Sequence, residues 1–512
     1  MDINYMSENI KLYDLSKAIK KTVSMEYEHV ISDSKADVGA VLKGNAYVTD
    51  DNAVIENDML KLKGKMNILI CIRSVNGNIF SVHNVSEINE KMDVYANERA
   101  PVIISKVVVE KVDSRIINER KVAVKVRYTV YVDCNTDKEI NIVSGLENGD
   151  NAEMMTEMVN IHAYNGCFMK DTDVTDTYLV PNDCPEVFEL LYYEAALKSM
   201  DHSVTADGIN VSGNVCFRLY YSFGDRGENM NYLENCASFN ELIETNGMKV
   251  DKMFLNAKVA NFVINAEQDS DGEYRLINSS AKISLAVLCF EETTVKKAGD
   301  VYGINNRLIP QVQSEVYSFP VKNSLSTCQI SETVTLGMEK QVSEVLGMDA
   351  YAYVADHVYD DNGILTVRGS VPVSIIYKDA NGEINVFSKE MPLRYEEKIN
   401  IDSKMMVKVS TEQVSSGYNL LSGNEVDIRV NVSLAFVVYG SDSFSYINDI
   451  QVNEYSDDRI HASLVLHYCS GNETVWSISK KYHIHQKTLR QMNGLEDDDV
   501  SLEDGRQIII PM

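Results

Sequence analysis

The sequence predicts a mainly β protein with three related antiparallel domains of the β-sandwich kind and a small C-terminal β-α-α-β module. Two observations favour this fold class. A segment in which apolar and polar residues alternate after a glycine occurs three times in the 512 residues, and such alternation is typical of a half-buried strand. Residues 458–512 instead show helical spacing between two short strand-like runs. At about 150 residues per domain, the length also suggests several domains.

The three repeated segments align on Gly64, Gly213 and Gly369. The repeat length of about 150 residues is too long for a solenoid and indicates a duplicated domain. The apolar residues after each glycine occupy the same alternate positions. They are Met66, Ile68, Ile70 and Ile72, then Val215, Phe217, Leu219 and Tyr221, then Val371, Val373, Ile375 and Tyr377.

Each repeated segment leads into a turn. Asn76-Gly77 and Asn381-Gly382 stand at the same distance from the aligned glycine, and the middle repeat has Arg226-Gly227 nearby. Asn-Gly accepts the positive φ angles of a type I′ turn, so each repeat is predicted to contain a β-hairpin. A further alternating strand follows in every repeat. These strands contain Val122, Val124, Val126, Tyr128 and Val130, then Ile283, Leu285 and Val287, then Val426, Ile428, Val430, Val432 and Leu434.

The repeat spacing gives the predicted domain boundaries. Residues 35–165, 166–305 and 306–457 form the three repeats, and residues 458–512 form the C-terminal module. Residues 1–34 are predicted to be a separate helical segment, because their apolar residues are loosely periodic. Those apolar residues are Ile10, Leu12, Leu15, Ile19 and Val23.

The C-terminal module shows helix signals between its two strands. Thr474 is the predicted N-cap of the first helix, in which Val475, Ile478 and Tyr482 form one apolar stripe. Leu489 and Met492 are predicted to form the stripe of the second helix. Asn493-Gly494 then ends that helix with a left-handed residue.

Charge and cysteine content exclude several classes of protein. The chain has 48 Lys and Arg against 76 Asp and Glu, a formal charge of −28, which disfavours nucleic acid and anionic lipid as partners. The nine cysteines have irregular spacing and form no C-x-x-C pair. We therefore expect reduced thiols in a cytoplasmic protein. No leader-like apolar segment and no run of about 18 apolar residues is present, so we expect no membrane insertion.

No catalytic signature is present either. The sequence contains no phosphate-binding loop and no G-x-S-x-G elbow. Asp171, Asp173 and Asp176 lack the spacing of a calcium loop and are interpreted as a solvated acidic segment. His483 and His485 are interpreted as surface histidines, because a metal site would need further ligands. We expect no enzyme activity, no catalytic residue, no metal site and no cofactor.

The segment Val180–Leu191 resembles a family signature. Its proline-containing lead-in to an apolar run is similar to that of the SPOCS domains of spore coat proteins, and a short helix over Val187–Leu191 is expected from the apolar spacing. The resemblance implies three SPOCS-type repeats. The lead-in is clear in the second repeat, survives without prolines in the third and is fainter in the first.

The C-terminal module resembles a LysM domain. The motif positions are Gly471, Thr474, Val475, Trp476, Ile478, Leu489, Asn493, Gly505, Ile508, Ile510 and Pro511. LysM domains commonly bind N-acetylglucosamine polymers in a groove between two loops. The resemblance implies a groove formed by Gly471, Asn472, Glu473, Thr474 and Val475, facing Asn493, Gly494, Leu495 and Glu496.

Two departures from the LysM motif leave the ligand open. The first loop has one residue more than the motif, and the second loop continues into the acidic run Asp497, Asp498 and Asp499. The groove could therefore bind a protein, or a glycan such as peptidoglycan, cortex or chitin-like polymer.

The whole layout resembles that of SipL-like spore coat morphogenesis proteins and is similar to that of SpoVID. This implies a non-enzymatic scaffold at the forespore surface in the mother-cell cytoplasm. The implied role is to link a SpoIVA-like basement-layer ATPase of the coat to other coat proteins.

Overall fold

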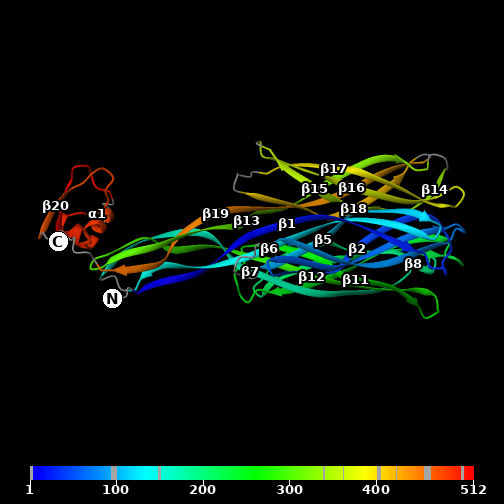
Figure 1. Cartoon of the computed structure of the whole chain (residues 1–512), viewed down its shortest axis with the longest axis horizontal. Helices are drawn as coiled ribbons and strands as arrows, with labels where there is room; N and C mark the ends of the chain where they lie inside the picture. The colour runs from blue at the N-terminus through cyan, green and yellow to red at the C-terminus, as the bar shows by residue number, and fades with distance from the viewer. Residues whose placement is uncertain are drawn as a thin grey trace.

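A computed structural model describes residues 4–93, 101–147, 151–337, 341–360, 362–399, 405–421, 424–454, 463–496 and 501–511. The fold is mainly β, with two short helices among these residues, as predicted. Each repeat contains two antiparallel sheets that pack face to face, and the long strands of all three repeats continue into a common stem (Figure 1). The LysM-like module lies at the end of the stem.

The first repeat shows the arrangement most simply. Its first sheet has the order β1-β6-β5 and its second sheet the order β2-β3-β4. Apolar side chains from both sheets, such as Ile68 and Val126, form a shared core. The strands are β1 (Tyr5–Val30), β2 (Val38–Glu56), β3 (Met59–Ser74), β4 (Ile79–Asp93), β5 (Val102–Asn118) and β6 (Lys121–Leu146).

The second repeat follows the same topology. The sheet β11-β12-β7 packs on the sheet β10-β9-β8 around a core that includes Phe217 and Leu285. The strands are β7 (Ala152–Leu179), β8 (Glu189–Val204), β9 (Gly208–Phe223), β10 (Asn229–Glu244), β11 (Lys252–Gln268) and β12 (Tyr274–Gly303). The expectation of reduced thiols is wrong for one pair, because Cys216 and Cys236 stand opposite each other on β9 and β10 and form a disulfide.

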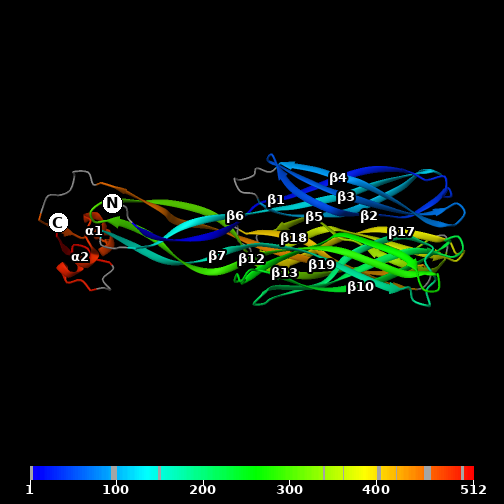
Figure 2. The same ribbon diagram turned by 90° about the horizontal axis from the view of Figure 1, so that it is seen from below.

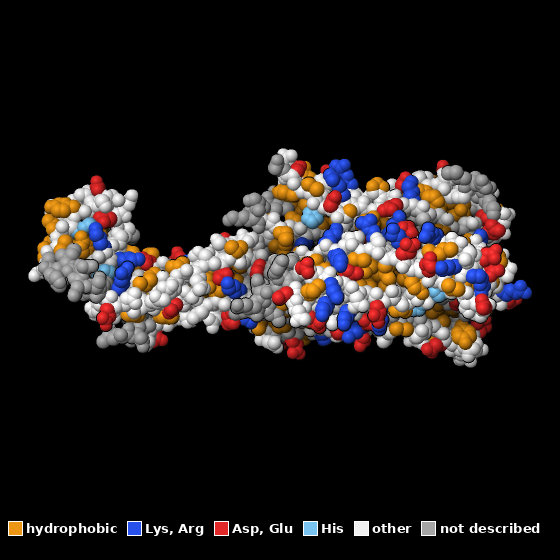
Figure 3. All heavy atoms as spheres, viewed as in Figure 1, with side chains coloured by type: hydrophobic (Ala, Val, Ile, Leu, Met, Phe, Trp, Pro, Cys, Tyr) orange, Lys and Arg blue, Asp and Glu red, His pale blue; other side chains and the backbone are white. Residues whose placement is uncertain are grey.

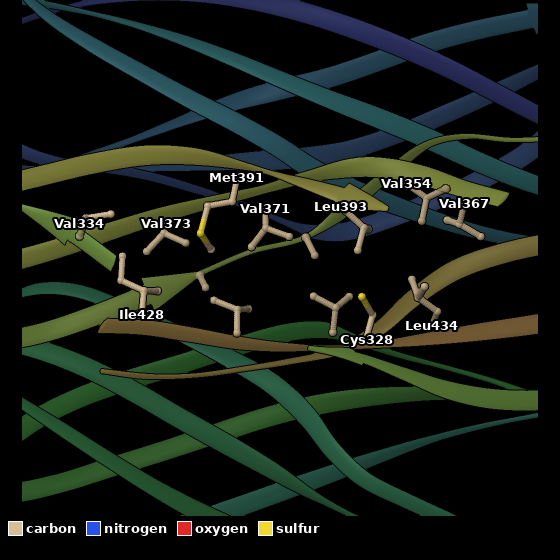
Figure 4. Packing of buried hydrophobic residues seen from close by; sticks show 14 of the residues in the cluster. Cys328, Val334, Val354, Val367, Val371, Val373, Met391, Leu393, Ile428 and Leu434 are labelled. Atoms are coloured by element: carbon tan, nitrogen blue, oxygen red, sulfur yellow. The ribbon is translucent and has the colours of Figure 1, made fainter. Parts of the chain in front are cut away.

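The third repeat differs at one strand. Two strands, β14 and β15, pair along the same side of β16, where each other repeat has one bulged strand. Its core contains Val371, Met391 and Ile428 between the sheets (Figure 4). The strands are β13 (Arg307–Thr335), β14 (Val342–Ala350), β15 (Tyr353–Tyr359), β16 (Ile364–Asp379), β17 (Ile384–Lys398), β18 (Met406–Leu420) and β19 (Glu425–Asn453).

The three predicted hairpins are present, as β3–β4, β9–β10 and β16–β17. The predicted type I′ turn is wrong. Gly77 and Gly382 have φ angles of 89° and 82°, whereas Asn76 and Asn381 do not have positive φ. The amide of Gly77 donates to the carbonyl of Ser74 at 3.0 Å. A left-handed glycine that follows the turn is the arrangement of a three-residue hairpin loop, which needs only one positive φ.

The predicted helix over residues 1–34 is wrong, because Tyr5–Val30 form strand β1, paired along its length with β6. Ile10 and Leu12 are buried on one face, a period of two that the loose helical pattern concealed. The first repeat therefore begins with β1 rather than at residue 35. The short helix expected over Val187–Leu191 is also wrong, since Glu189 already begins strand β8. The amides of Val187 and Phe188 donate to the carbonyls of Tyr274 and Ser222, outside any helix.

A second predicted domain boundary is displaced as well. The boundary between residues 165 and 166 falls inside β7, which begins at Ala152 and pairs with β12. The boundary between residues 305 and 306 lies in the turn between β12 and β13. The boundary between residues 457 and 458 lies outside the described residues.

The stem is formed by three pairs of strands that extend beyond their sandwiches. In the first repeat, β5 pairs with β6 only as far as Asn135, whereas β1 and β6 continue together to Leu146. The pairs β7–β12 and β13–β19 continue in the same way. Figures 1 and 2 show these ribbons side by side along the long axis. Their shared core contains Leu12, Ile142, Ile161, Val295, Tyr317 and Phe444.

A buried polar cluster joins the three sandwiches at the opposite end from the stem. Lys43 of the first repeat forms an ion pair with Asp349 of the third, and both side chains are buried. The Lys43 ammonium also lies 4.2 Å from the ring centroid of Tyr192 in the second repeat. Tyr351 donates to Glu194 at 2.9 Å in the same cluster. Each repeat thus supplies a partner to the others.

Replacing Asp349 by Asn should destabilise the chain by about 3–5 kcal/mol, because it leaves the buried ammonium of Lys43 without its counter-ion. Urea unfolding followed by circular dichroism would measure this loss. Glu56→Gln, which removes an exposed ion pair with Lys61, is the matched control and should leave the midpoint unchanged. Equal midpoints for the two variants would contradict a structural role for the buried pair.

Candidate functional site

The C-terminal module has the predicted strand-helix-helix-strand order. It contains β20 (Leu464–Tyr468), α1 (Val475–Tyr482), α2 (Gln486–Asn493) and β21 (Gln507–Pro511), and the two strands pair antiparallel. The helices pack on one face of the strands. The core of the module includes Val475, Ile478, Leu489, Leu495, Ile508 and Ile510. The module therefore has an apolar core separate from those of the repeats.

Both predicted helix caps are confirmed. The hydroxyl of Thr474 accepts from the amide of Ser477 at 3.0 Å, and the Ser477 hydroxyl accepts from the amide of Thr474 at 2.9 Å. Gly494 ends α2 in the left-handed region, with φ at 62°. The predicted pairing of Leu489 with Met492 in one buried stripe is wrong, because Leu489 is buried but Met492 is exposed.

The first loop of the predicted groove combines exposed and anchored residues. Gly471 and Asn472 are exposed, and Asn472 has a φ of 77°. Glu473 accepts from the amide of Ser470 at 2.9 Å and bonds to the ring of His467 at 2.9 Å. The hydrogen bond from Ser470, followed by the interaction with His467, holds the pKa of Glu473 below 4.5. Glu473 therefore supports the loop.

The second loop is anchored by Asn493. Its side-chain amide donates to the carbonyls of Leu489 and Ile509 at 2.9 and 2.8 Å, and its oxygen accepts from the amide of Ile509 at 2.6 Å. Leu495 is buried, whereas Gly494 and Glu496 are exposed. The acidic run at residues 497–499 lies outside the described residues.

The two loops adjoin through the segment that follows the second loop. Thr474 bridges to Ser501, and the amide of Leu502 donates to the carbonyl of Glu473 at 3.0 Å. Of the nine predicted groove residues, five serve the fold of the module: Glu473, Thr474, Val475, Asn493 and Leu495. The four exposed residues are Gly471, Asn472, Gly494 and Glu496. A ligand at these loops would meet backbone groups and two polar side chains.

Three side chains with metal-binding atoms meet beneath the first loop. The donor atoms of His467, Cys469 and Glu473 lie within 4.8 Å of one another. Both ring nitrogens of His467 are hydrogen-bonded, to the Tyr482 hydroxyl at 3.1 Å and to Glu473 at 2.9 Å. Burial raises the pKa of the Cys469 thiol. These contacts explain the cluster as an internal support of the loop.

No motif in the sequence predicts the contact between the module and the stem. Asp300, near the end of β12, accepts from the indole nitrogen of Trp476 at 2.9 Å and from the Lys480 ammonium at 2.6 Å. The Tyr302 ring stands edge-on to the Trp476 ring, with centroids 4.9 Å apart. The Tyr302 hydroxyl donates to the carbonyl of Ile484 at 2.9 Å.

Glu153 of β7, which pairs with Tyr302 of β12, completes the contact. Its carboxylate accepts from the backbone amide of Gln486 at 2.9 Å and from the side-chain amide of Gln486 at 2.7 Å. His485, the N-cap of α2, makes no side-chain capping bond, so a stem carboxylate caps this helix. A negative charge there is also favoured by the helix dipole. We call Glu153, Asp300 and Tyr302, with Trp476, Lys480 and Gln486, the stem latch.

Charge pairing stabilises the stem latch. Burial alone would raise the pKa of Asp300, but the hydrogen bonds from Lys480 and Trp476 outweigh it and hold the pKa below 3.8. Because the pKa of the docked carboxylate is depressed, its contribution is complete above the ordinary pKa and is lost as the pH falls through the lowered value. Asp300 is therefore ionised near neutral pH, where the latch is closed.

Comparison with known proteins identifies the module alone. Residues 472–511 match the LysM domain family, so the chain carries a LysM domain at its C-terminus. No curated protein and no solved structure matches the chain. A LysM domain suggests binding of glycans that contain N-acetylglucosamine, or a role at the cell wall. Within the described ranges, neither helix has the length and hydrophobicity needed to cross a membrane.

Asp300→Ala should release the LysM domain from the stem, because Trp476 and Lys480 lose their shared acceptor. Trp476 is the only tryptophan, so its emission should shift to longer wavelength as the indole meets water. Glu157→Ala, which removes a stem carboxylate paired with Lys297, is the matched control and should leave the spectrum unchanged. Identical spectra for the wild type and Asp300→Ala would exclude a closed latch in solution.

Proposed function

We propose that this chain is a non-enzymatic scaffold of the SipL-like, SPOCS-repeat kind in spore coat assembly. In this proposal the LysM domain docks a SpoIVA-like ATPase of the coat basement layer, and the three repeats recruit other coat proteins. The chain acts in the mother-cell cytoplasm at the forespore surface.

The observation that carries the proposal is the fixed display of the LysM domain at the end of the stem. Asp300 and Glu153 hold the domain by its helices. Exposed Glu496 follows α2, at the end of that helix away from the bound Gln486. Exposed Asn472 precedes α1, near the bound Trp476, and its loop stays accessible. A display of this kind suits a protein that joins two partners, since linked binding sites raise the effective concentration of each.

The groove itself favours a protein partner. The Thr474 hydroxyl caps α1, and the Asn493 side chain bonds to the backbone of β21. Few side-chain donors therefore remain to form hydrogen bonds with sugar hydroxyls. A protein surface can be bound through the backbone and exposed side chains of the two loops, with bridging water at the rim.

The alternative is a glycan-binding protein that recognises N-acetylglucosamine polymers of peptidoglycan, cortex or a chitin-like glycan. The LysM family match favours it, as do the exposed glycines Gly471 and Gly494, whose backbone groups a sugar could approach closely. The two functions predict different ligands for the same loops.

Capture of a purified SpoIVA-like ATPase by the full chain should weaken at least about tenfold in an Asn472→Lys, Glu496→Lys double variant, a change of about 1.4 kcal/mol. Lys487→Glu, an exposed change on α2, is the matched control and should bind as the wild type does. Surface plasmon resonance would measure both affinities.

Labelled chitin oligomers provide the opposing test. Under the scaffold proposal they show no saturable binding to the full chain. Saturable binding at micromolar concentration, together with loss of binding in the double variant, would replace the protein partner by the glycan. Equal ATPase capture by the double variant and the wild type would remove the two loops from the partner interface.

A further inference from the structure

The strand β20 of the LysM domain has an open edge. β20 pairs with β21, and Leu466 stands opposite Ile509. The backbone N–H and C=O of Ile509 both bond to the Asn493 side chain, at 2.6 and 2.8 Å, on the side away from β20. In an antiparallel ladder this makes Leu466–Ile509 a non-hydrogen-bonded pair, so the backbone N–H and C=O of Leu466 point to the open side.

The same geometry extends along the strand. Leu464 and Tyr468 share the orientation of Leu466, because backbone direction alternates with a period of two. Cys469 has the opposite orientation, since its amide donates to the carbonyl of Arg506 at 2.9 Å on the β21 side. Within the described part of the chain no other strand pairs with this edge. β20 therefore presents a row of backbone donors and acceptors.

The side chains of this edge form an apolar row. Leu464, Leu466 and Tyr468 are 54%, 45% and 59% exposed, and Ile509 beside Leu466 is 36% exposed. His467, between them, points into the domain and is buried. Edge strands are often protected by a charged side chain, a proline or a bulge, and β20, although only five residues long, has none of these three.

We propose that two copies of this chain associate through their β20 edges. The strand is self-complementary, because an antiparallel two-fold arrangement centred on Leu466 places Leu466 opposite its equivalent. Leu464 then lies opposite Tyr468 of the second copy, and the apolar rows of both strands lie on one face. Such a pair is isologous, the commonest form of closed homodimer. It places no like charges opposite each other along the strand.

The position of β20 permits this contact. In Figure 1, β20 lies at the outer end of the LysM domain, and α1 lies on the side nearer the stem. Figure 3 shows hydrophobic side chains at that end of the molecule. The stem latch uses α1 and the start of α2, so it leaves β20 accessible. Two chains can therefore meet end to end with their sandwiches far apart.

The charge of the chain predicts the salt dependence of this association. Each copy carries a formal charge of −28, so two copies repel each other at long range. Added salt screens that repulsion without weakening apolar and backbone contacts. Association through β20 should therefore become tighter as salt concentration rises.

Analytical ultracentrifugation of the full chain, from about 1 to about 100 µM, tests the proposal over the affinity range of a specific dimer. The wild type should form an elongated dimer. Leu466→Lys and Tyr468→Lys should each weaken dimerisation at least about tenfold, because a charge protects the edge. Met158→Lys, which replaces an exposed apolar residue of the stem, should dimerise as the wild type does.

Trp476 emission in each variant reports whether the LysM domain remains folded. A wild type that stays monomeric throughout the range would overturn self-pairing and leave the edge to a strand of another protein. A dimer that persists in both β20 variants, or that is lost equally in Met158→Lys, would place the contact elsewhere and overturn the proposal.

Discussion

The structure depends on the mutual burial of three two-stranded ribbons. A single ribbon of this kind is marginally stable in water, because one of its faces stays exposed. Leu12, Ile161 and Tyr317, from the three repeats, share one apolar core instead. The repeats are therefore not independently folded domains. Each long strand runs between its own sandwich and the stem, where it packs against strands of the other repeats, so the three must fold as one body.

The other features follow from that constraint. Three sandwiches that share a stem also meet at their far ends, where Lys43 and Asp349 satisfy each other in a buried interface. At the end of the stem, Glu153 and Asp300 of the paired strands β7 and β12 bind the two helices of the LysM domain. The proposed scaffold thus has a rigid arm, a recognition domain at its end and an open β edge beyond.

The sequence predicts local patterns better than distant pairings. The hairpins and the LysM domain could be predicted because their signals lie close together in the sequence. Gly64 and its equivalents are followed directly by an alternating strand, and Thr474 and Gly494 cap helices of only a few residues. Strand β1 could not, since only its pairing with β6, more than a hundred residues later, distinguishes Ile10 and Leu12 from a helical face. The stem latch was missed for the same reason, as Asp300 and Trp476 are distant in the chain and carry no joint motif.

Hydrogen exchange measured by mass spectrometry along the stem tests the shared-core account most directly. Backbone amides around Ile10–Leu12, Ile161–Ala163 and Tyr317–Phe319 lie in three different repeats. We expect slow exchange at all three, with a common protection that is lost together as denaturant is added, because the ribbons form one cooperative unit. Rapid exchange in any one ribbon while the other two remain protected would contradict it.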